Sequence, residues 1–327
     1  MSQEIRPKVY VTRQIDQAGL LLLHEVCQVE IWLGEMPVPR EVLLREVTMC
    51  DGLLALVTDK IDEELLQAAP NLRVVSNMAV GYDNIDVAAC TRHGVLVGNT
   101  PGVLTETTAD LAFALLMATA RRVVESAEYI KSGHWHTWGP LTLLGADIHH
   151  ATLGIAGFGR IGREMAKRGR GFDMQLLYCG NHRDEQAERD FPGLSYVSKA
   201  ELLRQSDFVS LHLPLNAHTL HYLGAAEFAT MKRTAIVINT ARGPIIGSAA
   251  LVQALQKGQI AGAGLDVTDP EPILLTDPLL QMPNVVVLPH IGSASYTARA
   301  QMSLKAAQNL IAALRGEPMY SCLNPQL

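Results

Sequence analysis

Three ionisable side chains in the second half of this sequence, Arg242, Glu271 and His290, each lie close after an apolar run. An arginine guanidinium can bind a carboxylate through two parallel hydrogen bonds and polarise a neighbouring carbonyl. Histidine is well suited to deliver a proton near neutral pH, and a carboxylate beside it favours its protonated form and fixes its ring. Together the three groups could protonate the oxygen of a small 2-keto acid while its carbonyl carbon is reduced.

The surroundings of these residues strengthen that interpretation. They lie in segments 239–244, 264–272 and 288–294, each of which follows or ends an apolar stretch that is typical of a buried strand. Taken singly, Arg242 could be a surface arginine, Glu271 a turn residue and His290 a core histidine. Three such residues at successive strand ends instead indicate one active site at the carboxyl edge of a parallel sheet.

A glycine-rich turn precedes all three segments. It reads Gly157-Phe158-Gly159-Arg160-Ile161-Gly162, follows the apolar run 151–156 and opens a predicted helix at 160–168. The order strand, glycine turn and helix is that of a dinucleotide site, because the glycines permit a tight turn and close approach of backbone to a pyrophosphate. The helix N-terminus then offers unpaired N–H groups to the phosphates. We expect Gly157, Gly159, Arg160, Ile161 and Gly162 to bind a cofactor.

The elements that must position these residues alternate between strand and helix along most of the chain. Such alternation predicts an α/β fold with two parallel-sheet, doubly wound domains. Because about 150 residues precede the glycine turn, we expect a nucleotide-binding Rossmann domain, residues 101–293, inserted into a flavodoxin-like substrate-binding domain, residues 1–100 and 294–327. The strand candidates are 9–12, 29–33, 53–57, 72–76, 95–98, 151–156, 176–179, 208–213, 235–239, 262–267 and 285–288, and the longer helix candidates are 105–121 and 296–315.

Composition narrows the function classes. Nearly half of the 327 residues (48%) are hydrophobic and the net charge is −6 without a basic stripe, which argues against a nucleic-acid partner. Five scattered cysteines show no paired metal spacing and are typical of a reducing compartment, so we expect a cytoplasmic protein with no metal site. No apolar stretch is long enough to predict a membrane span, and residues 1–8 are polar, unlike a signal peptide.

The sequence resembles the D-2-hydroxyacid dehydrogenases, and most closely the glyoxylate/hydroxypyruvate reductases among them. The resemblance extends from about Leu53 to the C-terminus and rests on segments 80–86 (VGYDNID), 99–101 (NTP), 157–162 and the three strand-end segments. It implies that Arg242 binds substrate, that His290 is the proton donor and that Glu271 pairs with it.

The same resemblance implies further contacts. The backbone of Val80 and Gly81 would hold the substrate carboxylate, with Ser293 also at the substrate, and Asp266 would contact the nicotinamide amide. The residues expected to line the cofactor are Thr108, Pro214, Thr240, Ala241 and Gly292. In similar reductases a tryptophan at the position of Trp138 enters the active site of the partner subunit of a homodimer. Packing in the dimer interface is the other role we consider for Trp138.

Cofactor choice is expected about 20 residues beyond the last glycine of the turn. There the strand 176–179 continues into Gly180, Asn181, His182 and Arg183, and the first acidic residue is Asp184. A carboxylate at the strand end would repel a 2′-phosphate, whereas these polar and basic residues could bind one, so the segment favours NADPH. Similar NADP-using reductases often carry arginine where this chain has Asn181, and NADH remains an alternative.

We therefore expect an NADPH-preferring reductase that converts glyoxylate and hydroxypyruvate to glycolate and D-glycerate. One alternative keeps the chemistry and changes the substrate to a bulkier 2-keto acid such as 2-ketogluconate. Another is an NAD(H)-sensing, corepressor-like binding protein. That alternative predicts a long polar tail and a basic nuclear signal, and neither is found in this sequence.

Overall fold

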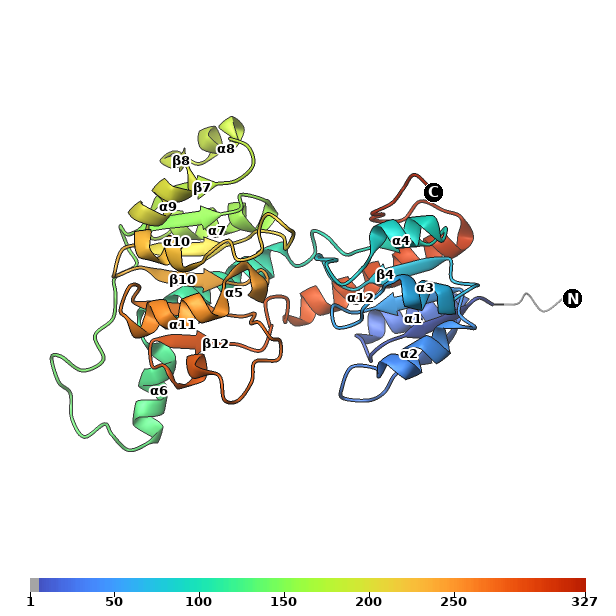
Figure 1. Ribbon diagram of the computed structural model, residues 1–327, viewed down its shortest axis with the longest axis horizontal. Coiled ribbons are helices and arrows are strands. Elements are labelled where there is room, and N and C mark those ends of the chain that lie inside the picture. Colours follow the sequence, from blue (N-terminus) through green and yellow to red (C-terminus); the bar gives the residue numbers. More distant parts are fainter. Residues whose placement is uncertain (1–5) are drawn as a thin grey trace, which may run out of the picture. The chain divides into compact units, whose positions relative to one another are not determined.

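The computed structural model describes residues 6–327, which form two compact units (Figure 1). One unit comprises the described residues to Leu104 together with Ala294–Leu327, and the other comprises Thr105–Ser293. In both units the strands are parallel, and most helices connect one strand to the next.

The first unit is built on a five-stranded sheet in the order β2-β1-β3-β4-β5. This is the flavodoxin-like doubly wound order. The final helix of the chain, α12, packs against α1 and against β3 and β4, which places the C-terminal segment in this unit. Its elements are β1 (Lys8–Val11), α1 (Gln17–Val26), β2 (Gln28–Ile31), α2 (Arg40–Val47), β3 (Gly52–Ala55), α3 (Glu63–Ala68), β4 (Val74–Asn77), α4 (Val87–Arg92), β5 (Leu96–Gly98) and α12 (Tyr296–Arg315).

The second unit has a seven-stranded sheet in the order β8-β7-β6-β9-β10-β11-β12. The order reverses between β6 and β9, which is where nucleotides bind in Rossmann folds. Its helices are α5 (Thr105–Ala120), α6 (Val123–Lys131), α7 (Arg160–Arg170), α8 (Glu185–Asp190), α9 (Lys199–Gln205), α10 (Ala225–Thr230) and α11 (Ser248–Gln256), with short 3-10 turns η1 (Gly243–Ile245) and η2 (Pro278–Gln281). Its strands are β6 (Thr152–Ala156), β7 (Gln175–Cys179), β8 (Leu194–Tyr196), β9 (Phe208–Leu211), β10 (Ile236–Asn239), β11 (Gly262–Leu265) and β12 (Val285–Val287).

Burial on both faces explains why apolar and polar residues do not alternate along the central strands of this sheet. All residues of β6, β9, β10 and β11 are buried, because helices cover both faces of a parallel sheet. Two apolar cores lie on the two faces of this sheet. One includes Phe228 and Leu251, and the other includes Phe113 and Tyr178.

The predicted fold class is confirmed, and the differences concern individual elements. The helix predicted at 105–121 ends at Ala120, because Arg122 adopts a left-handed backbone conformation (φ 52°) before α6 begins. The short edge strand β8 was not expected, and two of its three residues are exposed, so it has no buried apolar run. Helices α6 and α8–α10 were also not expected. Three of these have only six or seven residues, too few to show a clear 3.6-residue pattern.

Candidate active site

The carboxyl ends of β9, β10, β11 and β12 lie at the same edge of the second sheet, because these neighbouring strands are parallel. The glycine turn, the segment expected to choose the cofactor and the three strand-end segments lie at or after the ends of these strands or of β6 and β7. Pro214 follows β9, Thr240 and Ala241 follow β10, Asp266 follows β11 and His290 follows β12. The topology thus gathers these residues at one edge.

The glycine turn joins β6 to α7. Gly157 has φ +92°, and a Cβ atom there would lie 2.6 Å from the backbone oxygen of His212. A Cβ on Gly162 would lie 2.3 Å from the backbone oxygen of Gly157, so this glycine lets the helix pack against the turn. At Gly159, the N-cap of α7, a Cβ would meet no atom of residues 6–327 within 4 Å. The first and third glycines therefore serve the fold, and the second leaves space for a ligand above the helix N-terminus. Arg160 and Ile161 are the first two residues of that helix.

His290 and Glu271 are in direct contact. The imidazole Nδ1 of His290 lies 2.5 Å from Oε1 of Glu271, and the two side chains are 31% and 40% exposed. When Nδ1 carries a proton it donates to the carboxylate, which leaves Nε2 as the ring atom available for proton transfer. The backbone of His290 is left-handed, with φ 56°.

Glu271 is ionised under ordinary conditions. Burial by itself raises the pKa of its carboxyl group, but the hydrogen bond and charge of His290, with a smaller contribution from Arg242, more than offset this and lower the pKa below its usual value. The carboxylate therefore provides a constant negative charge beside the imidazole.

Arg242 is held by the end of β10. The buried side chain of Asn239 donates from Nδ2 to the backbone oxygen of Arg242 at 2.9 Å, and its Oδ1 accepts the Ala241 N–H at 3.0 Å. The Arg242 guanidinium donates to the backbone oxygen of Ala241 at 2.8 Å. Asn239 thus fixes the turn that carries the arginine.

Asp266 positions the segment that carries His290. Its two carboxylate oxygens accept the N–H groups of Ile291 and Gly292, each at 2.7 Å, and its backbone oxygen accepts the N–H of His290 at 2.9 Å. The residue is 1% exposed, and burial raises the pKa of its carboxyl group despite these hydrogen bonds. Thr108 of α5 lies close by, since a Cβ on Gly292 would be 3.5 Å from its methyl carbon. Thr108, Asp266 and Gly292, three predicted cofactor residues, are therefore neighbours.

The residues present fit a nicotinamide dinucleotide. Besides the open position at Gly159, the buried Oγ1 of Thr240 has no hydrogen-bond partner among the described residues. A buried hydroxyl without a partner is unfavourable in the free protein, and a ligand that bonds it would remove that cost. Pro214 is exposed at the end of β9, and Ala241 is partly exposed beside Thr240.

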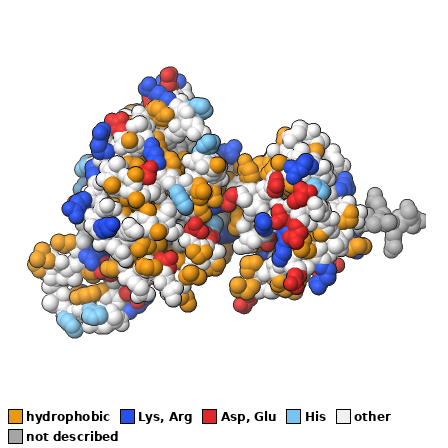
Figure 2. All heavy atoms as spheres, in the orientation of Figure 1, with side chains coloured by type: hydrophobic (Ala, Val, Ile, Leu, Met, Phe, Trp, Pro, Cys, Tyr) orange, Lys and Arg blue, Asp and Glu red, His pale blue; other side chains and the backbone are white. Residues whose placement is uncertain are grey.

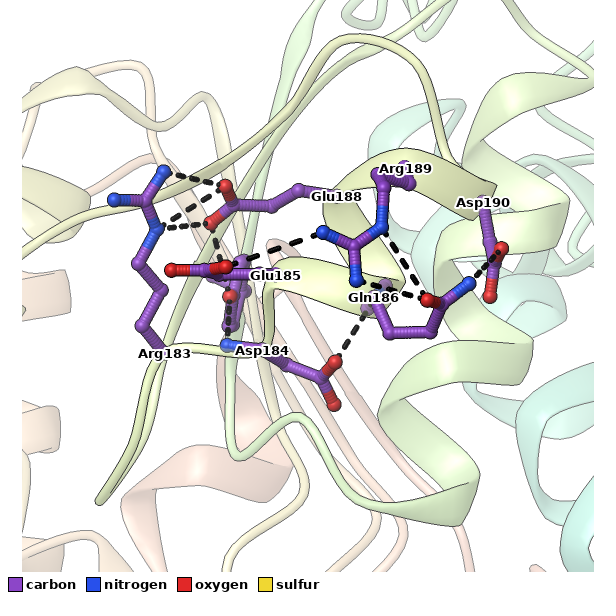
Figure 3. Close-up of polar contacts among 9 residues, drawn as sticks. Arg183, Asp184, Glu185, Gln186, Glu188, Arg189 and Asp190 are labelled. Atoms are coloured by element: carbon purple, nitrogen blue, oxygen red, sulfur yellow. Dashed lines mark hydrogen bonds and ion pairs between the residues drawn. The ribbon is translucent and has the colours of Figure 1, made fainter.

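The segment predicted to choose between cofactors follows β7. Gly180, Asn181, His182 and Arg183 are all exposed, and the backbone oxygen of Gly180 accepts a hydrogen bond from the Tyr196 hydroxyl at 3.1 Å. Arg183 is already in an ion pair with Glu188 of α8 (Figure 3).

In the first unit, the backbone carbonyls of Val80 and Gly81 are held by asparagines. Asn99 donates to the Val80 oxygen and Asn77 to the Gly81 oxygen, each at 2.9 Å. The N–H groups of Val80 and Gly81 donate to no acceptor within residues 6–327. Two adjacent amides without protein partners can bind an anion.

Trp138 lies apart from the strand-end residues in the long loop after α6, where 79% of its side chain is exposed. Ser293, three residues after His290, is the last residue of the second unit.

Three residues that position the site were not singled out from the sequence for that role: Asn77, Asn99 and Asn239. All three are buried asparagines at or just beyond the end of a strand. A polar residue that ends a fully apolar run is the signal that could have indicated them. The positioning of the His290 segment by Asp266 was likewise not expected.

Neither a metal-binding cluster nor a membrane-spanning helix is found among the described residues. Within residues 6–327, no three His, Cys, Asp or Glu side chains are grouped so that they could hold a metal ion. No helix in the same range is both long and apolar enough to cross a membrane.

A Rossmann sheet with this glycine turn and a His–Glu pair at its carboxyl edge defines the class of nicotinamide-dependent dehydrogenases. Residues 113–292 match the family model for the NAD binding domain of D-isomer specific 2-hydroxyacid dehydrogenases. A glyoxylate reductase from Korarchaeum cryptofilum is 49% identical over 324 residues, which cover 99% of this chain and 97% of that protein.

Solved structures agree. A glyoxylate reductase from Paecilomyes thermophila has a TM-score of 0.86 and 34% identity, covering 98% of this chain and 99% of that one. An NADPH-dependent glyoxylate/hydroxypyruvate reductase from Sinorhizobium meliloti, solved with NADP and malonate, has a TM-score of 0.85 and 31% identity, covering 97% of both chains. This chain belongs to the D-isomer specific 2-hydroxyacid dehydrogenase family and is an NAD(P)H-dependent oxidoreductase.

Proposed function

We propose that this enzyme reduces glyoxylate and hydroxypyruvate to glycolate and D-glycerate and prefers NADPH. The observation that carries the proposal is the contact between His290 and Glu271 at the edge where Arg242 also lies. The relatives named glyoxylate reductase, and the Sinorhizobium meliloti enzyme named for both substrates, support the choice of keto acid.

The substrate carboxylate is bound by charge and by backbone amides. Arg242 supplies the positive charge and a planar pair of N–H donors, which suits a carboxylate. Val80 and Gly81 supply two amides that have no acceptor within the described chain. Asn99 orients the Gly81 N–H by binding the Val80 carbonyl of the same peptide group, and the Thr100 N–H orients the Val80 N–H by binding the Ala79 carbonyl. Ser293 adds a hydroxyl to the same substrate.

His290 donates the proton, and Glu271 positions His290 for that transfer. When bound, the reduced nicotinamide supplies a hydride to the carbonyl carbon of the keto acid. His290 donates the proton from Nε2 to the carbonyl oxygen, which becomes the hydroxyl group of the product. Glu271, ionised because of its lowered pKa, holds the ring through Nδ1 and stabilises the positively charged imidazole before the transfer.

The cofactor is held at the carboxyl edge of the second sheet. The α7 N-terminus at Gly159 would hold the pyrophosphate, and the Thr240 hydroxyl would donate to the bound dinucleotide. Asn181, His182 and Arg183 would hold the 2′-phosphate of NADPH, since none of these three residues is acidic.

A homodimer is part of the same proposal. None of the nine residues of α6 is buried in the described chain, and the loop after it exposes Trp135, Trp138, Leu141 and Leu144. Figure 1 shows α6 and this loop projecting from the second unit, and Figure 2 shows hydrophobic and histidine side chains over the same region. Exposed aromatic and apolar residues in one projecting segment are typical of an interface.

Sedimentation measurements test the dimer. Trp138→Ala should weaken self-association at least tenfold if Trp138 packs in the interface. If it instead reaches the partner's active site, the dimer should persist and kcat/KM for a bulkier 2-keto acid should rise. A wild-type protein that sediments as a monomer at micromolar concentration would refute the dimer.

The central experiment is a steady-state comparison. We expect kcat/KM for glyoxylate and hydroxypyruvate to exceed that for 2-ketogluconate, and each to be higher with NADPH than with NADH. Absence of activity with both small acids would refute the reductase proposal. Higher kcat/KM with 2-ketogluconate would favour the bulkier-substrate alternative, and a clear preference for NADH would refute only the proposed cofactor preference.

A further inference from the structure

The segment proposed to bind the 2′-phosphate already contains a negative charge. The Arg183 guanidinium contacts both carboxylate oxygens of Glu188, with Nη2 2.7 Å from Oε2 and Nε 3.0 Å from Oε1 (Figure 3). This two-point geometry is the favourable one for an arginine–carboxylate pair. Arg183, the permanent cation of the proposed phosphate site, is therefore neutralised in the free protein.

Glu188 is the anchored partner of this pair. The Tyr178 hydroxyl donates to Glu188 Oε1 at 3.1 Å and accepts the Asp184 N–H at 2.7 Å. Tyr178 belongs to β7 and is 0% exposed, so the sheet itself holds Glu188 in place. The Glu188 side chain is 17% exposed and that of Arg183 is 59% exposed. The Arg183 side chain can therefore move away from this contact more easily than the Glu188 side chain can.

The neighbouring cations are paired as well. Arg163 forms an ion pair with Asp184. Arg189 donates to Gln186 and lies 3.9 Å from Glu185 (Figure 3). From Arg183 to Asp190 the sequence contains two arginines and four acidic residues, so this segment carries a net charge of −2. A 2′-phosphate carrying about two negative charges would meet an electrostatic environment without excess positive charge.

We propose that Glu188 is a specificity-determining residue that weakens NADPH binding by holding Arg183 and thereby lets the enzyme use NADH as well. The inference rests on the proposed placement of the 2′-phosphate at Asn181–Arg183. A ribose 2′-hydroxyl both donates and accepts, so it can bond to the intact Arg183–Glu188 pair. A phosphate must compete with Glu188 for Arg183 and must then remain beside the negative charge of the Glu188 carboxylate.

Glu188→Gln tests this in binding measurements that need no keto acid. Glutamine keeps an oxygen for the Tyr178 hydroxyl and removes the negative charge. We expect the NADPH dissociation constant to fall about tenfold while that of NADH changes by less than about twofold, a difference in the range of a close charge pair. Glu185→Gln is the matched control, because it removes one charge from the same helix at a residue without a close ion pair to Arg183. It should leave the ratio of the two constants within about twofold.

Two further variants connect the effect to Arg183. Arg183→Gln should raise the NADPH dissociation constant about tenfold or more with little effect on NADH, and Arg183→Gln/Glu188→Gln should lack the gain of Glu188→Gln alone. Thermal unfolding of each variant checks that the unit remains folded. Arg183→Gln should change the NADPH dissociation constant in the opposite direction to Glu188→Gln. The proposal can therefore be tested even if one of these variants fails to fold.

Three results would overturn the inference: an unchanged NADPH/NADH ratio in Glu188→Gln, an equal gain in Glu185→Gln, or a gain that persists in the double variant. These outcomes are separable from failure of the proposed function. Binding of the two dinucleotides is measured without substrate. Their dissociation constants could therefore be determined even if the enzyme reduced neither glyoxylate nor hydroxypyruvate. An unchanged ratio would leave the keto acid assignment intact.

Discussion

Glu271 accepts a hydrogen bond from His290 across 2.5 Å, and each residue follows a different strand of one parallel sheet. Glu271 lies six residues beyond β11, and His290 three residues beyond the neighbouring strand β12. The contact lowers the pKa of Glu271 against the opposing effect of its burial. A carboxyl group whose ionised form is favoured therefore accompanies the proposed proton donor.

Glu271→Gln should slow reduction more than it weakens cofactor binding. The glutamine keeps an oxygen near Nδ1 of His290 but removes the negative charge that stabilises the positively charged imidazole before proton transfer. We expect kcat for glyoxylate reduction to fall about tenfold or more, while the NADPH dissociation constant stays within about twofold. A kcat equal to that of the wild type would contradict the proposed role of Glu271.

His290→Asn should separate chemistry from cofactor binding. Asparagine tolerates the left-handed backbone conformation of this position (φ 56°), whereas alanine would add backbone strain. Loss of a general acid should reduce kcat by about 10²–10⁴-fold. Because no cofactor role is proposed for this side chain, the NADPH dissociation constant measured by fluorescence should stay within about twofold. Equal losses in turnover and cofactor binding would remove the acid assignment.

Gly157 and Gly159 should respond differently to the same added methyl group. Gly157→Ala forces a side chain into a left-handed conformation and within 2.6 Å of the His212 carbonyl, so it should destabilise the second unit by about 1–3 kcal/mol. Gly159→Ala fits an ordinary backbone conformation (φ −80°) and meets no described atom within 4 Å. It should unfold at the wild-type temperature and yet bind NADPH at least tenfold more weakly. A Gly159→Ala protein with normal cofactor affinity would exclude the pyrophosphate from this turn.

Much of the fold follows from the sequence, because apolar runs separated by helical stretches permit few arrangements other than parallel sheets. The seven-stranded sheet has the order expected for a Rossmann unit, and its glycine turn follows the strand next to the reversal point. Because His290 and Glu271 follow adjacent parallel strands, their contact is a consequence of topology.

The side-chain partners could not be predicted in the same way. Spacing showed that Arg183 follows β7, but its pairing with Glu188 depends on a six-residue helix whose sequence has no clear periodicity. Similarly, Asn239 could be seen only as the end of an apolar run, since its bonds to Ala241 and Arg242 depend on how the turn folds back. Both are choices among side-chain conformations that residue types and spacing leave open.

His212 should make the second unit sensitive to acid. Burial lowers the pKa of this histidine to about 4 from 6.5, so the unfolded chain binds a proton that the folded chain excludes. The contribution of neutral His212 to the free energy of unfolding is fully present above pH 6.5. It is lost as the pH falls from 6.5 to about 4. Between pH 7 and pH 5, urea unfolding should show a loss of at most about 2 kcal/mol that His212→Gln lacks. His182→Gln, at an exposed position, is the control, and an identical pH dependence in all three proteins would contradict the prediction.

Thr240→Val should weaken cofactor binding without weakening the free protein. The Thr240 hydroxyl is buried without a partner in the described residues, so its replacement by a methyl group of similar size removes an unsatisfied polar atom. The free energy of unfolding without cofactor should therefore be unchanged or rise by up to about 1 kcal/mol, while the NADPH dissociation constant rises about five- to tenfold. Thr119→Val is the matched control, because the buried Thr119 hydroxyl already donates to the Leu115 carbonyl at 2.8 Å. Thr119→Val should have a slightly lower free energy of unfolding and an unchanged NADPH dissociation constant. A Thr240→Val protein that binds NADPH as tightly as the wild type would mean that this hydroxyl does not bond to the dinucleotide.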